Sequence, residues 1–382
     1  MVSTRLNRNC KKSGIYSFMN TVKQKKKTQN GLNVKRITAT VAFFILIITI
    51  AVIFFIFSDK IHDYFNDYEI IGAYERDLKV HFIDVGQGDA IIVELPDGSN
   101  VLIDSGSDDG DNDVEKDNAL TRYIDSLKID KFDFVIATHS DDDHIGMMET
   151  VFHNYEVDCV LRPKIPYVNE DNEYSFKSGF NAELLYGGYV CSSDAYFRFL
   201  RAVEKEGCEW SFFNYNSDLF YKIKDVSNEY VLTFDFLTPA ENNKQVVYSS
   251  SNEYSPIIVL EYRGKRFMFT GDAEKSTIAE LYENYEKSDC MVDVLKVPHH
   301  GSETSTTETF LNWINPEYAV ISCGVNNEYG HPHQNVLDML FSANVPVFRT
   351  DLQGSVTFEV ARNGNIKYSV ERDVSFEDLL LS

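Results

Sequence analysis

The chain has 382 residues, 43% of them hydrophobic and 13% aromatic, which is enough apolar material for one or two packed cores. Its formal net charge is −23, but the charges are unevenly distributed. Residues 1–57 hold ten Lys or Arg and no Asp or Glu, so the rest of the chain has 26 basic and 59 acidic residues, a net charge of −33. A domain this acidic excludes a general polyanion-binding surface, so any nucleic acid would have to be held locally.

Residues 37–57 form an uncharged, mostly apolar run of 21 residues. That length crosses a hydrocarbon layer of roughly 30 Å as a helix, so we predict a transmembrane anchor. A buried core helix would show a polar face, and a signal peptide would be followed by a small-x-small cleavage site, which the sequence IFSDK lacks. Six Lys or Arg precede the run within twenty residues and two follow it, so the positive-inside rule predicts a single-pass protein of the cell membrane. Residues 1–36 would be a cytoplasmic tail, and everything after the anchor would lie outside the cytoplasm, beginning with a linker over 58–77.

Short strands and helices follow the linker in alternation. The segments LKVHFIDVG, DAIIVEL and NVLIDSG indicate strands, with a hairpin turn at Asp97-Gly98. A helix is predicted over 117–128, a buried strand over 132–139, and a second helix over 192–206 with Ser192 or Ser193 as N-cap. Further strands are expected at 231–239, 255–264, 265–273, 293–297 and 317–324, with a helix over 276–287. This alternation predicts a layered α/β sheet protein with outer helices.

Cysteine usage adds little to this picture. The five cysteines beyond the anchor have no metal-ligand spacing, and their odd number does not suit an external disulfide framework. We expect most of them to be small buried apolar residues, with a Cys191–Cys208 bridge as the alternative.

Polar clusters stand just past the carboxyl ends of five predicted strands. They begin at Asp84, Asp104, His139, Asp272 and the pair His299-His300. In layered α/β folds such loops are where sites are assembled, because rigid strands aim the side chains. The stretch THSDDDHIG is the most informative, since a solvated loop explains its acids but not a histidine on each side. Histidine and carboxylate together are ligands for divalent metals.

Several motifs resemble those of a known family. The pattern His139-x-Asp141-x-Asp143-His144 is similar to the H-x-H-x-D-H metal motif of the metallo-β-lactamase superfamily. The segments HFIDVGQGDAIIVELPDGSNVLIDSG, FTGDAEK, LKVPHHGS and YGHPH resemble, more narrowly, the metallo-hydrolase domain of ComEC-type competence proteins. The resemblance runs over residues 78–360, which leaves 361–382 as a C-terminal tail. It implies a four-layer αβ/βα sandwich, here preceded by one transmembrane helix.

The resemblance also implies a dinuclear site. His139 and Asp141 would hold one ion, Asp143 and His144 the other, with Asp272 bridging them. His300 would add a ligand while His299 faces the substrate, and Asp84 and Asp104 would support the ligands from behind.

Two departures from the family pattern affect the first metal position. Asp141 replaces the second histidine of the motif, and the third-motif histidine has no counterpart, with Asn252 and Ser255 standing in its segment. Oxygen in place of nitrogen shifts preference from zinc toward harder ions, which leaves zinc and manganese both open.

Two divalent ions lower the pKa of a water molecule and clamp the oxygens of an in-line displacement, which suits phosphodiester hydrolysis. We therefore predict a phosphodiesterase or nuclease, with single- or double-stranded DNA as candidate substrate. The alternatives are a hydrolase of a cell-surface phosphodiester or another ester, and a non-catalytic binding module. The predicted catalytic residues are Asp143, His299 and His331, and the predicted substrate-binding residues are Gln87, Asp89, Asn252, Ser255, Ser302 and His333. The GHPH segment is otherwise a turn stiffened by Pro332, and the segment 162–230 either packs on the domain or overhangs the site.

Overall fold

The computed structural model describes residues 69–71, 76–108, 114, 117–168, 174–175, 191–213, 221–224, 229–239 and 248–379. The chain divides into two compact units at Asp67/Tyr68, and every described residue belongs to the second unit. The predicted tail at 1–36 and anchor at 37–57 lie outside the described residues. Among the residues that are described, no helix has both the length and the apolar character needed to span a membrane.

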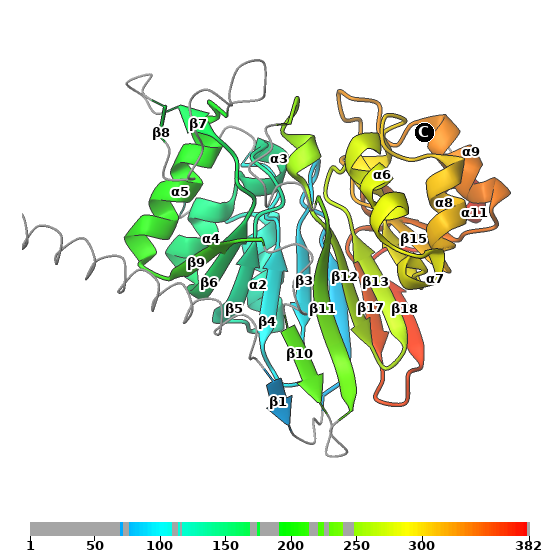
Figure 1. Ribbon diagram of the computed structural model, residues 1–382, viewed down its shortest axis with the longest axis horizontal. Helices are drawn as coiled ribbons and strands as arrows, with labels where there is room; N and C mark the ends of the chain where they lie inside the picture. Colours follow the sequence, from blue (N-terminus) through cyan, green and yellow to red (C-terminus); the bar gives the residue numbers. More distant parts are fainter. Residues whose placement is uncertain are drawn as a thin grey trace, which may run out of the picture. The chain divides into compact units, whose positions relative to one another are not determined.

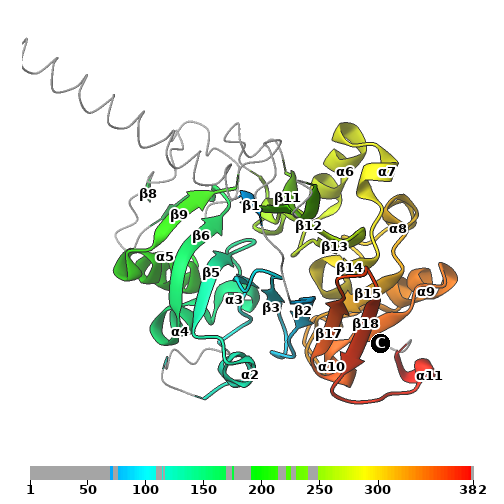
Figure 2. The same cartoon turned by 90° about the horizontal axis from the view of Figure 1, so that it is seen from below.

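Two eight-stranded sheets form the centre of the unit (Figures 1 and 2). The first sheet has the order β18-β17-β2-β3-β4-β5-β6-β9, and its strands from β4 to β9 run parallel. Its strands are β2 (Leu78–Phe82), β3 (Ile91–Glu94), β4 (Asn100–Ile103), β5 (Lys131–Ile136), β6 (Glu156–Arg162), β9 (Glu209–Phe212), β17 (Val356–Val360) and β18 (Ile366–Val370).

The second sheet has the order β1-β10-β11-β12-β13-β14-β15-β16, with β13 to β16 parallel. Its strands are β1 (Glu69–Ile71), β10 (Tyr221–Lys224), β11 (Tyr230–Thr238), β12 (Ile257–Tyr262), β13 (Lys265–Phe269), β14 (Val294–Lys296), β15 (Tyr318–Ile321) and β16 (Val347–Arg349). A separate small ladder pairs β7 (Tyr167–Val168) with β8 (Tyr174–Ser175).

Helices cover the outer face of each sheet, which gives the predicted four layers (Figure 2). On the first sheet lie α2 (Ala119–Leu127), α3 (Asp142–Ile145), α4 (Met148–Asn154) and α5 (Asp194–Glu206). Beside the second lie α6 (Lys275–Asn284), α7 (Lys287–Cys290), α8 (Glu308–Ile314) and α9 (Gln334–Ser342). The remaining short helices are η3 (Asn252–Tyr254), η4 (Pro298–Gly301), α10 (Thr350–Gln353) and α11 (Phe376–Leu379).

Three apolar layers hold the sandwich together. Two are cores between a sheet and its helices, one containing Leu102 and Phe199 and the other Leu295 and Phe310. The third lies between the sheets, where aromatic rings meet; the ring centroids of Phe82 and Phe269 are 6.2 Å apart. Tilted and edge-on ring pairs of this kind add to the free energy of apolar burial.

Local sequence signals explain how several elements begin and end. The Asn118 side chain caps α2 in a reciprocal pair with Thr121, and Ser193, one of the two predicted caps, accepts the Tyr196 N–H at the start of α5. The hairpin before β4 turns where predicted, with Gly98 at φ +98°, a region that glycine enters at little cost. No disulfide joins any two of the described cysteines, so the alternative of a 191–208 bridge does not hold.

Candidate metal centre

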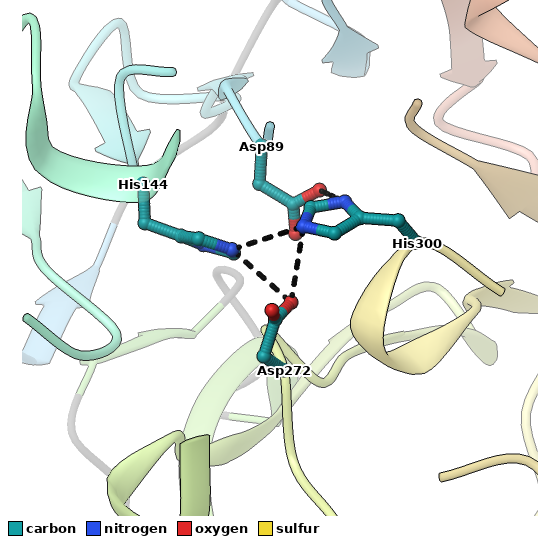
Figure 3. A group of neighbouring side chains, drawn as sticks. All are labelled: Asp89, His144, Asp272 and His300. Carbon is teal, nitrogen blue, oxygen red and sulfur yellow. Dashed lines mark hydrogen bonds and ion pairs between the residues drawn. The ribbon is translucent and has the colours of Figure 1, made fainter. Parts of the chain in front are cut away.

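The polar loops predicted from the sequence meet at one edge of the two sheets. His139 to His144 follow β5, Asp104 follows β4, Asp272 follows β13 and His300 follows β14. These are carboxyl ends of strands, as expected from the sequence, and both sheets contribute. Figure 3 shows four of the side chains, Asp89, His144, Asp272 and His300, pointing toward one another. All four are buried.

The orientation of His144 and His300 is fixed by what lies behind each ring. The Nδ1–H of His144 donates to Asp104 Oδ2 at 2.7 Å, and the Nδ1–H of His300 donates to the Ser322 carbonyl at 2.9 Å. Each ring therefore presents the lone pair of its Nε2, and these two atoms lie 3.3 Å apart. Two lone pairs facing each other at that distance repel unless a proton or a metal ion lies between them, so the pair is suited to hold a cation.

Asp272 and Asp143 complete this group of ligand atoms. Asp272 Oδ1 lies 3.1 Å from His144 Nε2 and 3.4 Å from His300 Nε2, and Asp143 Oδ2 lies 3.2 Å from His300 Nε2. Ligands at roughly 2.0–2.1 Å from a tetrahedral ion stand roughly 3.3 Å from one another. His144, Asp272 and His300 therefore fit the ligand spacing around one divalent ion, and Asp143 lies beside them at His300.

A second set of ligand atoms begins at His139. The Nδ1 of His139 contacts the hydroxyls of Thr138 and Ser255 at 3.1 and 3.2 Å, while its Nε2 is buried without a hydrogen-bond partner and faces Asp141 Oδ2 at 3.6 Å. Asp272 Oδ1 is likewise buried without a hydrogen-bond partner. A buried nitrogen or carboxylate oxygen without a hydrogen-bond partner lowers the stability of the fold unless a cation binds it. His139 and Asp141 thus fit a second ion position, with fewer protein ligands than the first.

Asp89 differs from its predicted role as a substrate contact. Its Oδ1 lies 2.9 Å from the Nζ of Lys296 and 3.4 Å from His300 Nδ1, and all three side chains are buried. A carboxylate committed to a buried ammonium group is not available to an entering substrate. Sequence reasoning missed Lys296 altogether, although a lysine in the apolar strand VLKVP is a signal of buried pairing.

The backbone at the site adopts conformations that non-glycine residues rarely take. Asp104, His299 and His300 have φ of +57°, +50° and +53°, so each of these ligand-bearing or ligand-supporting positions is strained. Gly88 permits a close approach, because a Cβ built there would lie 2.0 Å from the carbonyl oxygen of Asp143. The glycine of the DVGQGDA loop therefore lets that loop pack against the ligand loop.

The charges of the site act strongly on its histidines. Burial lowers the pKa of His144 and His300, but the carboxylates of Asp272, Asp104 and Asp143 outweigh it and hold the pKa of both rings well above the usual value. Burial raises the pKa of Asp143, and the facing rings outweigh it, so this carboxyl stays ionised. Protons therefore compete with a divalent ion for the two Nε2 atoms.

His299 and His331 lie beside His300 and next to each other. The His331 ring centroid is 5.4 Å from that of His299 and 6.1 Å from that of His300. Burial, followed by the charges of His300 and His299, lowers the pKa of His331 to about 4, and burial also lowers the pKa of His299. Both rings are therefore neutral at pH 7 in the free protein.

Most of the other residues that were predicted to bind substrate make hydrogen bonds to protein atoms. The Ser255 hydroxyl accepts the Asp272 N–H at 3.1 Å. Asn252 was predicted at the site, but it is its neighbour Ser251 that donates to Asp141 Oδ2, at 2.7 Å. The prediction therefore missed the residue that contacts this metal-ligand candidate by one position. Gln87 Oε1 accepts the Gly324 N–H. Other predicted residues contact neighbouring loop atoms: Ser302 contacts Thr304, and His333 accepts the Glu303 N–H.

Asp84 does not support the ligands as predicted. It contacts Arg372 and the Gly86 N–H instead. Its position at the carboxyl end of β2 suggested a place beside Asp104, but its side chain is engaged with these other partners.

Comparison with known proteins agrees with this geometry. The model of the metallo-β-lactamase superfamily matches residues 83–325. The chain belongs to the metallo-β-lactamase superfamily. Within that superfamily it is similar to ComE operon protein 3 of Bacillus subtilis, with 31% identity over 291 residues that cover 73% of this chain and 33% of the relative. It is also similar to competence protein ComA of Neisseria gonorrhoeae, with 23% identity over 290 residues, 76% of this chain and 33% of that one.

The chain spans about a third of the length of these curated relatives. Among solved structures, a metallo hydrolase from the archaeon Ignicoccus hospitalis has 17% identity and a TM-score of 0.42, covering 74% of this chain and 100% of that one. The chain thus combines a match to the metallo-β-lactamase superfamily with a buried Asp/His cluster that could hold a metal ion.

Proposed function

We propose that the protein is a metal-dependent phosphodiesterase or nuclease. The observation that carries this proposal is the position of Asp272, a buried carboxylate whose Oδ1 faces His144 and His300 and whose Oδ2 lies 3.6 Å from His299. Ligands from both sheets converge on this one residue, as a two-ion site requires. Divalent ions held there would lower the pKa of a water molecule and neutralise the charge of a phosphoryl group.

The chain's own residues supply the rest of the chemistry. Asp143, His144, Asp272 and His300 would hold one ion, and His139 and Asp141 would join Asp272 around the other, with zinc and manganese both suited to this mixed nitrogen and oxygen set. His299 and His331 lie beside His300 as neutral imidazoles. Each can donate a hydrogen bond to a phosphate oxygen, and a bound phosphodiester anion raises the pKa of the ring that it touches, which favours proton delivery to the leaving alkoxide.

The names of the competence relatives support DNA as the substrate. The acidic character of this chain favours a second candidate, a short or small phosphodiester, because a net charge of −33 after residue 57 repels a long polyanion. Both candidates use the same centre, and they differ only in how far the substrate extends from it.

We further propose that residues 37–57 anchor the protein in the cell membrane, with the hydrolase domain outside the cytoplasm. The support is the basic bias of six residues before the run against two after it. Alkaline phosphatase fused at the C-terminus should be active and a green fluorescent protein fusion dark. The reverse pattern would refute the topology without bearing on the hydrolase.

The activity is tested with the full-length protein in detergent. Asp143→Asn should lose metal and lower kcat/KM on bis-p-nitrophenyl phosphate and single-stranded DNA by roughly 10³-fold or more. Asp142→Asn is a matched control in the same loop, because Asp142 accepts the Ser107 hydroxyl at 2.6 Å and is not one of the ligands assigned to the centre. It should stay within about twofold of wild type. Equal activity of the two variants would refute the proposal, and hydrolysis of the small diester but not DNA would select the second candidate.

A further inference from the structure

The loop between β15 and α9 is held firmly beside the metal centre. Asn327 bonds three times across it, donating to the carbonyls of Gly324 and His331 at 2.9 and 2.6 Å and accepting the His331 N–H at 2.9 Å. Gly324 N–H in turn donates to Gln87 Oε1 at 3.1 Å, which ties this loop to the DVGQGDA loop. Side chains on the loop therefore have fixed positions relative to His331.

Tyr329 extends from this loop with its ring stacked on His331. The two ring centroids are 5.7 Å apart and the ring planes differ by 20°. Tyr329 nevertheless remains 66% exposed, whereas His331 is 9% exposed. One face of the tyrosine ring thus lies against His331, and most of the ring stays open to solvent at the rim of the centre.

We propose that Tyr329 is the stacking platform for a nucleobase next to the scissile phosphate. The proposal rests on the proposed phosphodiesterase function and assigns its substrate class as nucleotidic. A phosphate at the centre would lie beside His299 and His331, and the exposed Tyr329 ring stacks on His331. A base attached through one sugar to that phosphate therefore reaches the exposed tyrosine ring.

Stacking suits the electrostatics of this chain. A domain with a net charge of −33 presents no general polyanion-binding surface, so local contacts such as those near the scissile bond have to supply the affinity. Stacking of a base on an aromatic ring needs no positive charge and tolerates any base, since every base has a planar face. A lipid or polyol phosphodiester has no planar group to place on the ring, which separates the two candidate substrates.

The test compares a thymidine dinucleotide with its abasic analogue, in which both thymines are replaced by hydrogen, on the full-length protein. Tyr329→Ala should lower kcat/KM for the dinucleotide by roughly 5- to 150-fold, the range for stacking one base on one aromatic ring. The same variant should leave the abasic analogue unchanged, and Tyr329→Phe should restore the dinucleotide. Val325→Ala, at another exposed position of the same loop, is the matched control and should change neither substrate by more than about twofold.

Two outcomes would overturn the proposal. Equal losses on both substrates would show that Tyr329 acts only by positioning His331, and no loss on either would show that the ring meets no part of the substrate. Calorimetric binding of the dinucleotide keeps the test independent of turnover. If wild type hydrolyses neither compound, the phosphodiesterase function fails, while a 5- to 150-fold weaker Kd in Tyr329→Ala would still establish the base subsite.

Discussion

The buried pair between Lys296 and Asp89 offers a quantitative test of how the centre is supported. Lys296 is fully buried, and its Nζ lies 2.9 Å from Asp89 Oδ1 and 3.0 Å from the Val297 carbonyl. Lys296→Met removes the ammonium and leaves the buried Asp89 carboxylate without its closest cation. Breaking such a pair costs about 3–5 kcal/mol, a large share of the roughly 5–15 kcal/mol that stabilises an ordinary domain.

The double variant separates loss of the pair from loss of packing. Asp89→Asn alone leaves the ammonium unpaired and should cost a similar amount, whereas Lys296→Met combined with Asp89→Asn leaves no buried charge. It should recover most of the loss and lie within about 1–2 kcal/mol of wild type. Urea unfolding of the full-length protein at pH 7, with a chelator to remove metal, measures the free energy of unfolding of the wild type, the two single variants and the double variant.

A surface pair provides the control for the same chemistry. Lys79 and Glu94 are 3.4 Å apart, with side-chain exposures of 41% and 25%, so Lys79→Met should cost less than about 1 kcal/mol. The reasoning would be refuted if the losses of the two single variants simply added in the double variant, or if Lys296→Met were as mild as Lys79→Met.

The pH dependence of Lys296→Met follows from the pKa of Asp89. Burial raises that pKa, but Lys296 together with the His300 and His144 rings outweighs it and holds the pKa below the usual value. The pair therefore stabilises the wild type above the pKa of an unfolded carboxyl, and this contribution is lost as the pH falls through the folded pKa. Without Lys296 the pKa of Asp89 is higher than in the wild type, because the largest opposing charge is gone, so the carboxylate becomes protonated at a higher pH. The stability deficit of Lys296→Met should accordingly be larger at pH 7 than at pH 4.

Three further predictions concern the ligands and the rings beside them. Asp272→Ala removes a shared anionic ligand, so elemental analysis should show a loss of metal and turnover should fall by roughly 10³-fold or more. Full metal content with near-normal turnover would contradict the two-ion site. Asp104→Asn should weaken metal binding by roughly 10- to 100-fold, because His144 loses the carboxylate that orients it, and an unchanged metal titration would exclude that role. His331→Gln should keep its metal and lower turnover by roughly 10²- to 10⁴-fold. A substrate whose leaving group needs no proton should recover part of that loss. A loss of metal would instead make His331 a metal ligand.

The sequence was most informative where ligands are contiguous or follow a strand directly. The motif from His139 to His144 lies on one short loop, and strand periodicity alone places Asp104 and Asp272 just past the carboxyl ends of their strands. The partner of Lys296 could not be predicted, because Asp89 lies in the loop before β3, a strand of the other sheet that is far away in sequence. Ser251 was missed for a local reason: the η3 turn directs Ser251 rather than Asn252 at Asp141, and a one-residue rotation in a tight turn is not visible in composition.

Strand β17 has a consequence for how the domain is synthesised. It pairs antiparallel with β2, so residues Val356–Val360 complete the hydrogen bonding of residues Leu78–Phe82. During translation the β2 edge must wait for nearly the whole domain to emerge before its partner exists, and an open apolar edge invites pairing with other chains. Pairings this distant in sequence close slowly. A nascent chain of this protein therefore depends on protection of that edge until its last strands are made.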